Sequence, residues 1–158
     1  MQHMRDHQMA GHGHMGMSSA DNRDLLHFPP PLRAQMLRNM RDHVETLSGI
    51  LAALASDDFN GAAKIATERL GLDSPAAAAC KPKSANAAPS SQGSMDEMMA
   101  LFMPTPMRAI GLALHTSASE FSVVATRAAA THDTKAAVEA LSRVSQNCVA
   151  CHAAYRLQ

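Results

Sequence analysis

Apolar residues recur at steps of three and four along most of the chain, which is the spacing of one helix face. Prolines suit a first helical turn, aspartate caps a helix start, and glycine ends a helix. The first stripe follows the prolines at 29–31, ends at Asp57-Asp58 and comprises Leu32, Met36, Met40, Val44, Leu47, Leu51 and Leu54. The second is stopped by Gly71 and comprises Phe59, Ala62, Ile65, Ala66 and Leu70. The pattern therefore predicts two consecutive helices.

Two further stripes lie in the second half of the chain, after a short apolar segment from Met95 to Met103. Thr105-Pro106 opens a helix that carries Met107, Ile110, Leu114, Phe121, Val124 and Ala128. Asp133 caps another that carries Ala137, Leu141, Val144, Cys148, Cys151 and Tyr155. No window alternates apolar and polar residues as strands do. The predicted fold is all-α, an antiparallel four-helix bundle.

Two stretches fall outside these stripes. Residues 1–27 are polar, rich in His and Met and without a period, so they are predicted to form a disordered tail. Residues 73–94 are rich in Ala, Pro and Ser and are predicted to form a flexible linker between the second and third helices. The bundle domain is thus expected to cover residues 28–158. No stretch approaches the ~18–20 apolar residues of a membrane span.

Charge and composition narrow the function classes. Lys and Arg number 14 and Asp and Glu number 14, so the net charge is zero with neutral His. This balance disfavours nucleic-acid binding, which requires clustered positive charge. Trp is absent and Phe and Tyr total five (4 + 1), whereas Met reaches 12 and His 9. The excess indicates a role for thioether and imidazole ligands.

The sharpest motif is Cys148-Val149-Ala150-Cys151-His152. On a helix the two thiols share one face, where they can add to the two vinyl groups at one edge of a haem, and His152 can reach its iron. Cys-x-x-Cys-His therefore predicts attachment of one covalent haem c. A thioredoxin-like pair would open a helix after a strand, and a zinc site would need a second Cys/His pair. Only Cys80 is left over, a free thiol in the predicted linker or a link between two chains.

With this motif near its end, the chain resembles the class II cytochromes c, that is cytochrome c-prime and its low-spin, Met-ligated relatives. The closing sequence NCVACHAAYRLQ matches the family's pattern of an aromatic and an Arg after the haem His. The resemblance covers residues 28–72 and 95–158. It implies a four-helix bundle with a covalently bound haem. It also implies that the protein transfers electrons to partner proteins that the sequence does not identify, and it allows a homodimer through the first helices. It also implies a periplasmic location, with a signal peptide absent from this chain and presumed removed.

The family takes its distal ligand from the first helix. Counting back from Ser56-Asp57 as the family pattern requires leads to Met40 or Arg41, and the soft thioether of Met40 is favoured, with Met36 as the alternative. His43, three residues from Met40, is a rival ligand. His43 and His115 are nevertheless interpreted as hydrogen-bonded or partly exposed helix histidines, although His115 has a neighbour on the apolar stripe and can face the haem. For the haem propionates, Arg33, Arg38 and Arg156 are candidates, and Arg156 is favoured because it follows the attachment motif.

Two alternative functions stay open. With an open sixth position, the protein would bind NO or CO as cytochrome c-prime does. With copper on the tail, it would be a copper-handling protein, because His3, His7, His12 and His14 interleave with Met residues. No acid–base or nucleophile set can be recognised in the sequence, so the chain is not predicted to be an enzyme.

Overall fold

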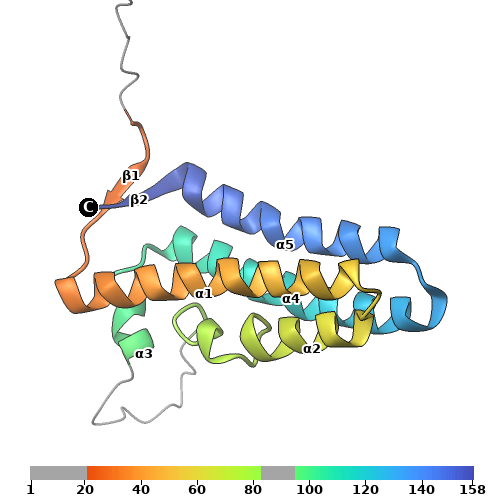
Figure 1. Cartoon of the computed structure of the whole chain (residues 1–158). Helices are drawn as coiled ribbons and strands as arrows, with labels where there is room; N and C mark the ends of the chain where they lie inside the picture. The colour runs from red at the N-terminus through yellow and green to blue at the C-terminus, as the bar shows by residue number, and fades with distance from the viewer. Residues whose placement is uncertain (1–20, 83–94) are drawn as a thin grey trace, which may run out of the picture.

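The computed structural model describes residues 21–82 and 95–158. In chain order its elements are β1 (Asp24–Leu26), α1 (Pro30–Ala55), α2 (Phe59–Arg69), the 3-10 helix η1 (Pro75–Ala77), α3 (Met95–Ala100), α4 (Thr105–Thr131), α5 (Thr134–Ala154) and β2 (Tyr155–Leu157). The described part of the chain is mostly helical (Figure 1), so the prediction of an all-α class is confirmed.

Local sequence explains where the helices begin and turn. The Asp58 carboxylate accepts a hydrogen bond from the Gly61 amide at 2.8 Å, and the Asp133 carboxylate accepts one from the Ala136 amide at 2.9 Å. Each occupies an amide at a helix start that has no partner within the helix. Asp57 and His132 adopt left-handed backbone conformations, with φ of 56° and 54°, in the turns just before these caps. The α1–α2 and α4–α5 connections are therefore tight.

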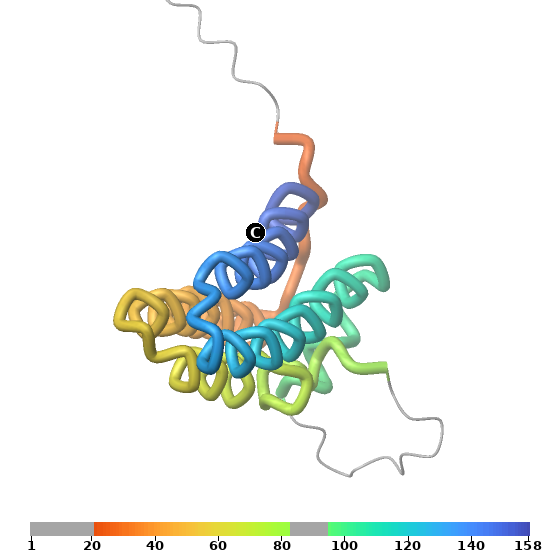
Figure 2. Tube along the Cα trace, turned by 90° about the vertical axis from the view of Figure 1, so that its right-hand side faces the viewer, coloured from red at the N-terminus to blue at the C-terminus, as the bar shows by residue number. Residues whose placement is uncertain are grey.

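The helices pack in a definite order. α4 packs on both α2 and α5, and α1 packs on α2 and α3. By contrast, the backbones of α1 and α5 approach each other closely at few points (Figures 1 and 2), although side chains of both helices share the apolar clusters. The main apolar core lies among α1, α2, α4 and α5 at the end with the tight turns and includes Ile50, Leu54, Phe59, Phe121 and Leu141. The opposite end is built differently, as described below.

A small sheet joins the two ends of the described chain. β1 pairs with β2 in parallel, with Asp24 opposite Tyr155 and Leu26 opposite Leu157. The prediction of no strands is wrong here, because three-residue strands are too short to show an alternating pattern. Tyr155, predicted on the last helical stripe, instead begins β2. Residues 21–27, predicted as the end of the tail, contain β1, and Leu26 is buried.

Two other expectations differ from the structure. On α1, Val44 and Leu51 are 67 % and 54 % exposed, whereas His43 and Thr46 are buried. The buried face of α1 is thus rotated relative to the predicted stripe, since the prediction counted only apolar residues. In the predicted linker, Ser74, Ala77 and Ala79 are buried, and residues 75–77 form η1.

The helices of the described residues were also compared with the length and hydropathy of a membrane span. None is both long enough and apolar enough to cross a bilayer. The expected absence of a span agrees with this finding for residues 21–82 and 95–158.

Candidate functional site

A cavity opens between α1, α4 and α5. The space inside it that a water molecule can reach is about 140 Å³, below the range of ~300–1,000 Å³ typical of small-molecule and cofactor sites. α1, α4 and α5 supply most of the walls, and η1, α3 and the residues next to them close one side. No Asp or Glu of the described residues lines this space, which we call the main cavity.

The Cys-x-x-Cys-His motif lies on the last turns of α5 and faces this cavity. Cys148, Cys151 and His152 all line it, and both cysteines are free thiols that are partly buried. Burial raises the pKa of both thiols, and the nearby Cys148 raises that of Cys151 further. The thiols are therefore protonated near neutral pH. The structure thus brings the three predicted attachment residues to one wall.

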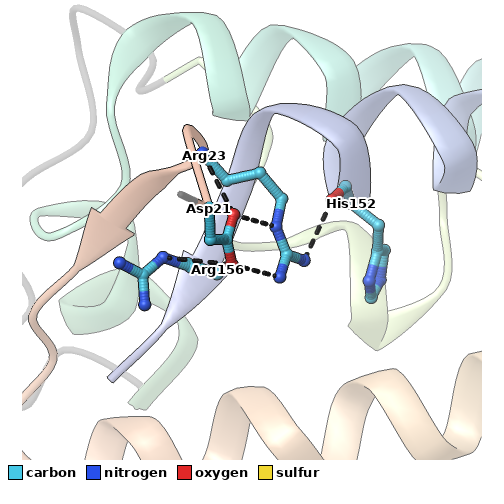
Figure 3. Close-up of polar contacts among 4 residues, drawn as sticks. All are labelled: Asp21, Arg23, His152 and Arg156. Atoms are coloured by element: carbon cyan, nitrogen blue, oxygen red, sulfur yellow. Dashed lines mark hydrogen bonds and ion pairs between the residues drawn. The ribbon is translucent and has the colours of Figure 1, made fainter. Parts of the chain in front are cut away.

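His152 is held at its backbone while its ring is exposed. Its carbonyl oxygen accepts a hydrogen bond from Nη1 of Arg23 at 3.3 Å. Figure 3 shows the imidazole projecting from α5 on the side away from the Arg23 guanidinium. This contact ties the segment before β1 to the end of α5, so the turn that carries His152 is fixed from outside the helix.

Methionines dominate the opposite walls. Met36 and Met40 enter from α1 and Met107 from α4, while Met99 and Met103 come from α3 and the turn after it. Met36 is 4 % exposed, and Met40 is only partly buried. Both candidate distal ligands therefore face the cavity that holds the motif. Unbranched thioether side chains adapt to irregular spaces and are soft ligands.

Two histidines also line the main cavity. His43 on α1 and His115 on α4 are buried, and their rings lie edge to face with centroids 5.8 Å apart. Nδ1 of His115 lies 2.7 Å from the carbonyl oxygen of Leu70, and because a carbonyl only accepts, this nitrogen donates. Nε2 of His43 is buried without a hydrogen-bond partner. The structure therefore supports the prediction that His115 is hydrogen-bonded and faces the pocket, but His43 is neither exposed nor satisfied.

Cys80 occupies an unexpected place. Predicted in the linker, it lines the main cavity together with Cys148 and Cys151. Its sulfur lies directly over Gly111 of α4, where a Cβ atom would collide with it. Burial raises the pKa of Cys80 to about 11, and Cys151 contributes to this rise. No local motif marks Cys80, because its role depends on how the chain folds back onto α4.

A second space, the outer groove, shares part of its lining with the main cavity and is also lined by Arg23, Arg156 and residues of α1, β2 and the α5 end. Asp21 accepts from Nε and Nη2 of Arg23 at 2.9 and 2.7 Å, and its carboxylate lies 3.4 Å from Nε of Arg156. These hydrogen bonds from Arg23 hold the pKa of Asp21 at about 2. Figure 3 shows both guanidinium groups around this carboxylate.

Of the three predicted propionate partners, only Arg156 lines this space. Nε of Arg33 donates to the carbonyl oxygen of Gln158 at 2.5 Å, and Nη2 of Arg38 donates to the side chain of Gln35 at 2.5 Å. Neither residue lines the main cavity or the outer groove. Arg23 was missed because it lies about 130 residues from the motif in sequence and reaches it only through the β1–β2 pairing.

The predicted copper ligands of the tail, His3, His7, His12 and His14, lie outside the described residues. Within residues 21–82 and 95–158, no three His, Cys, Asp or Glu side chains come together as a metal-binding group. Comparison of the chain with models of known families, with curated proteins and with solved structures found no match.

Proposed function

We propose that this chain is a c-type haem protein that carries electrons, with His152 as the proximal and Met40 as the distal ligand of the iron. One observation carries the proposal. Cys148, Cys151 and His152 from α5 and Met40 from α1 line the same cavity.

The residues present fit such a group. When bound, haem supplies a one-electron iron couple. Cys148 and Cys151 would hold it through thioether bonds, and His152 with Met40 would supply a nitrogen and a sulfur ligand. The buried Met36, Met99, Met103 and Met107 would exclude water, which together with methionine ligation favours a raised reduction potential. Arg156 and Arg23 at the mouth would pair with the propionates.

The finer assignments belong to the same proposal. The four longer helices, α1, α2, α4 and α5, are in the order and of the lengths expected for an antiparallel four-helix bundle. This arrangement is compatible with the resemblance to the class II cytochromes c. A periplasmic location follows from that resemblance. The exposed Val44 and Leu51 on α1 are compatible with a homodimer through the first helices. We assign the protein no catalytic reaction.

Absorption spectroscopy of the purified holoprotein tests the proposal. A covalent haem would remain with the chain after acid–acetone extraction and after denaturation. Methionine ligation would give a low-spin ferric spectrum with a sulfur–iron charge-transfer band, and Met40→Ala would abolish that band. The matched variant Met36→Ala, one turn earlier on the same helix, would retain it.

Other outcomes have defined meanings. A high-spin ferric spectrum together with rapid CO binding to the reduced protein would replace electron transfer by ligand binding at an open iron. Loss of the band in Met36→Ala rather than Met40→Ala would move the distal ligand by one turn. A chain that carries no covalent haem after co-expression with a cytochrome c maturation system would refute the proposal.

A further inference from the structure

The last turn of α5, which carries the motif, leaves one of its carbonyl groups without a donor from the helix. Carbonyl groups in the final turn of a helix lack intrahelical donors and find partners elsewhere. The Cys151 carbonyl accepts a hydrogen bond from the Tyr155 amide. In a longer helix the Arg156 amide would donate to the His152 carbonyl, but Arg156 belongs to β2. The His152 carbonyl therefore needs a donor from outside the helix.

Arg23 supplies that donor. Its Nη1 donates to the carbonyl oxygen of His152 at 3.3 Å, across 129 positions of the sequence. A cationic side chain at this end of a helix also balances the partial negative charge of the unpaired carbonyl groups. Figure 3 shows the Arg23 guanidinium against the backbone of His152, with the imidazole on the other side. The contact thus holds the backbone of His152 and leaves its ring to the main cavity.

Asp21 holds the Arg23 side chain in this position. Nε and Nη2 of Arg23 donate to the two carboxylate oxygens of Asp21 at 2.9 and 2.7 Å, and the backbone amide of Arg23 donates to the same carboxylate at 3.2 Å. All three guanidinium nitrogens are therefore engaged, two with Asp21 and one with His152. A guanidinium permits this arrangement because its donors point in fixed and different directions.

Arg33 makes a comparable contact at the other end of the small sheet. Its Nε donates to the carbonyl oxygen of Gln158, and the Gln158 amide donates to the carbonyl oxygen of Leu26 at 3.3 Å. Both arginines thus join the N-terminal part of the described chain to its C-terminal part. Arg33 does so beyond β2, whereas Arg23 does so at the turn that carries the motif. The two contacts therefore distinguish holding the sheet from holding the turn.

We propose that Arg23 is a positioning residue for His152 and that Asp21 orients Arg23 for this role. The inference deepens the proposed function and rests on it for the role of His152 as an iron ligand. In metal sites, groups outside the ligand shell fix the orientation of the ligands themselves. Arg23 does this through the backbone of the turn, which also carries Cys151.

Hydrogen exchange of the haem-free, full-length chain tests the placement of Arg23 without any haem. Exchange of the Tyr155 amide reports opening of the last turn of α5, and exchange of the Gln158 amide reports opening of the sheet. Arg23→Ala should speed exchange at Tyr155 by roughly 3- to 10-fold, as expected for the loss of one hydrogen bond, with less change at Gln158. Arg33→Ala is the matched control and should do the reverse.

Asp21→Ala separates the donor from its orientation. The variant keeps the Arg23 guanidinium but removes the carboxylate that holds it. Exchange at Tyr155 should therefore change in the same direction as in Arg23→Ala, but by a smaller factor. Urea midpoints of each variant check that the rest of the fold is retained.

The ferric holoprotein tests the link to the iron. The low-spin electron paramagnetic resonance spectrum depends on how the axial ligands are oriented, so a change in the turn reaches it through His152. Arg23→Ala should shift the g values, whereas Arg33→Ala should leave them unchanged.

Two results would overturn the inference. Equal acceleration of exchange at Tyr155 and Gln158 in Arg23→Ala would show that Arg23 only holds the sheet. Unchanged g values in the Arg23→Ala holoprotein would show that His152 keeps its orientation without Arg23. The proposed function fails separately, because a chain that acquires no covalent haem refutes that proposal while the exchange measurements still decide the placement of Arg23.

Discussion

The two ends of this molecule are built from the same helices with different side chains. At the end with the tight turns, Phe59, Ala66, Phe121, Ala125 and Ala137 are at most 1 % exposed and fill the space between helices. At the other end, α1, α4 and α5 surround a cavity whose lining includes five methionines. Small and aromatic residues pack against one another at the end with the tight turns, whereas thioethers line a cavity at the other end.

The two ends of the molecule therefore differ in what they contribute to stability and to chemistry. The packed end has aspartate caps, and none of the fully buried residues of its core contains sulfur. The cavity end gathers three thiols, five thioethers and two buried imidazoles. We therefore expect the packed end to determine folding free energy, and the cavity end to respond to pH, metals and cofactor.

The largest effect should come from Phe121→Ala at the packed end. The ring is fully buried, so its removal should lower the free energy of unfolding by about 3–5 kcal/mol. Met107→Ala, which lines the existing cavity, should cost about 2 kcal/mol or less, because part of its side chain already faces empty space. Urea denaturation of the haem-free chain measures both. Equal losses of unfolding free energy in the two variants would contradict the difference in packing between the two ends.

The next effect is a pH dependence confined to the cavity end. Burial, with His115 nearby, lowers the pKa of His43 from 6.5 to about 4, while Asp42 opposes the shift. Between these values the unfolded chain binds the proton and the folded chain does not. Unfolding free energy from this group is therefore complete above pH 6.5 and falls as pH drops towards 4, by about 3 kcal/mol at most.

Urea midpoints of the haem- and metal-free chain at pH 7 and pH 4.5 test this dependence. His43→Leu should flatten the profile, leaving the smaller contribution of His115, whose pKa burial also lowers. The exposed His27 provides the control, and His27→Gln should keep the full slope. A profile that His43→Leu leaves unchanged would place the proton uptake elsewhere.

A smaller effect on stability is expected where Cys80, from the predicted linker, packs on α4. A methyl group at Gly111 would collide with the sulfur of Cys80, so Gly111→Ala should destabilise the fold by about 1–3 kcal/mol. Cys80→Ala in the same chain should recover most of that loss, since it removes the colliding atom. Thermal unfolding of the two single variants and the double variant forms the cycle. Simple additivity would show that Cys80 does not occupy this position.

The smallest effect concerns the start of α5. Asp133→Ala removes the carboxylate that accepts from the Ala136 amide and should cost about 1 kcal/mol. Thr134→Ala, at the first position of the same helix, should change the unfolding free energy by less than half as much. Denaturant titration resolves the two. A loss in Asp133→Ala no larger than that in Thr134→Ala would argue against the cap.

Much of the fold could be predicted because helices leave a local trace. The stripes, the aspartates at helix starts and the Cys-x-x-Cys-His motif all depend on residues within a few positions of one another. Asp58 and Asp133 both cap helices as their positions predict. The all-α class followed from the same short-range periodicity.

What could not be predicted depends on contacts between distant segments. Cys80 lies against Gly111, and Arg23 donates a hydrogen bond to the backbone of His152. On α1, His43 is buried, whereas the apolar pattern predicts that its neighbour Val44 is. Each of these placements is decided by how helices rotate and fold back, which periodicity does not encode. The sequence does contain one sign of these placements, which is His43 next to the apolar stripe. Its burial can be understood only from the structure, where its ring lies beside that of His115.

The parallel pairing of β1 with β2 has a consequence for the order in which the chain assembles. It joins segments as far apart as His27 and Gln158, which are separated by 131 positions. Closing so long a loop costs conformational entropy, which three residue pairs and a few side-chain contacts, such as that of His27 with Gln158, offset. We expect this small sheet to form after the helices and to open before them, so the last turn of α5, with Cys151 and His152, is secured only when the rest is already folded.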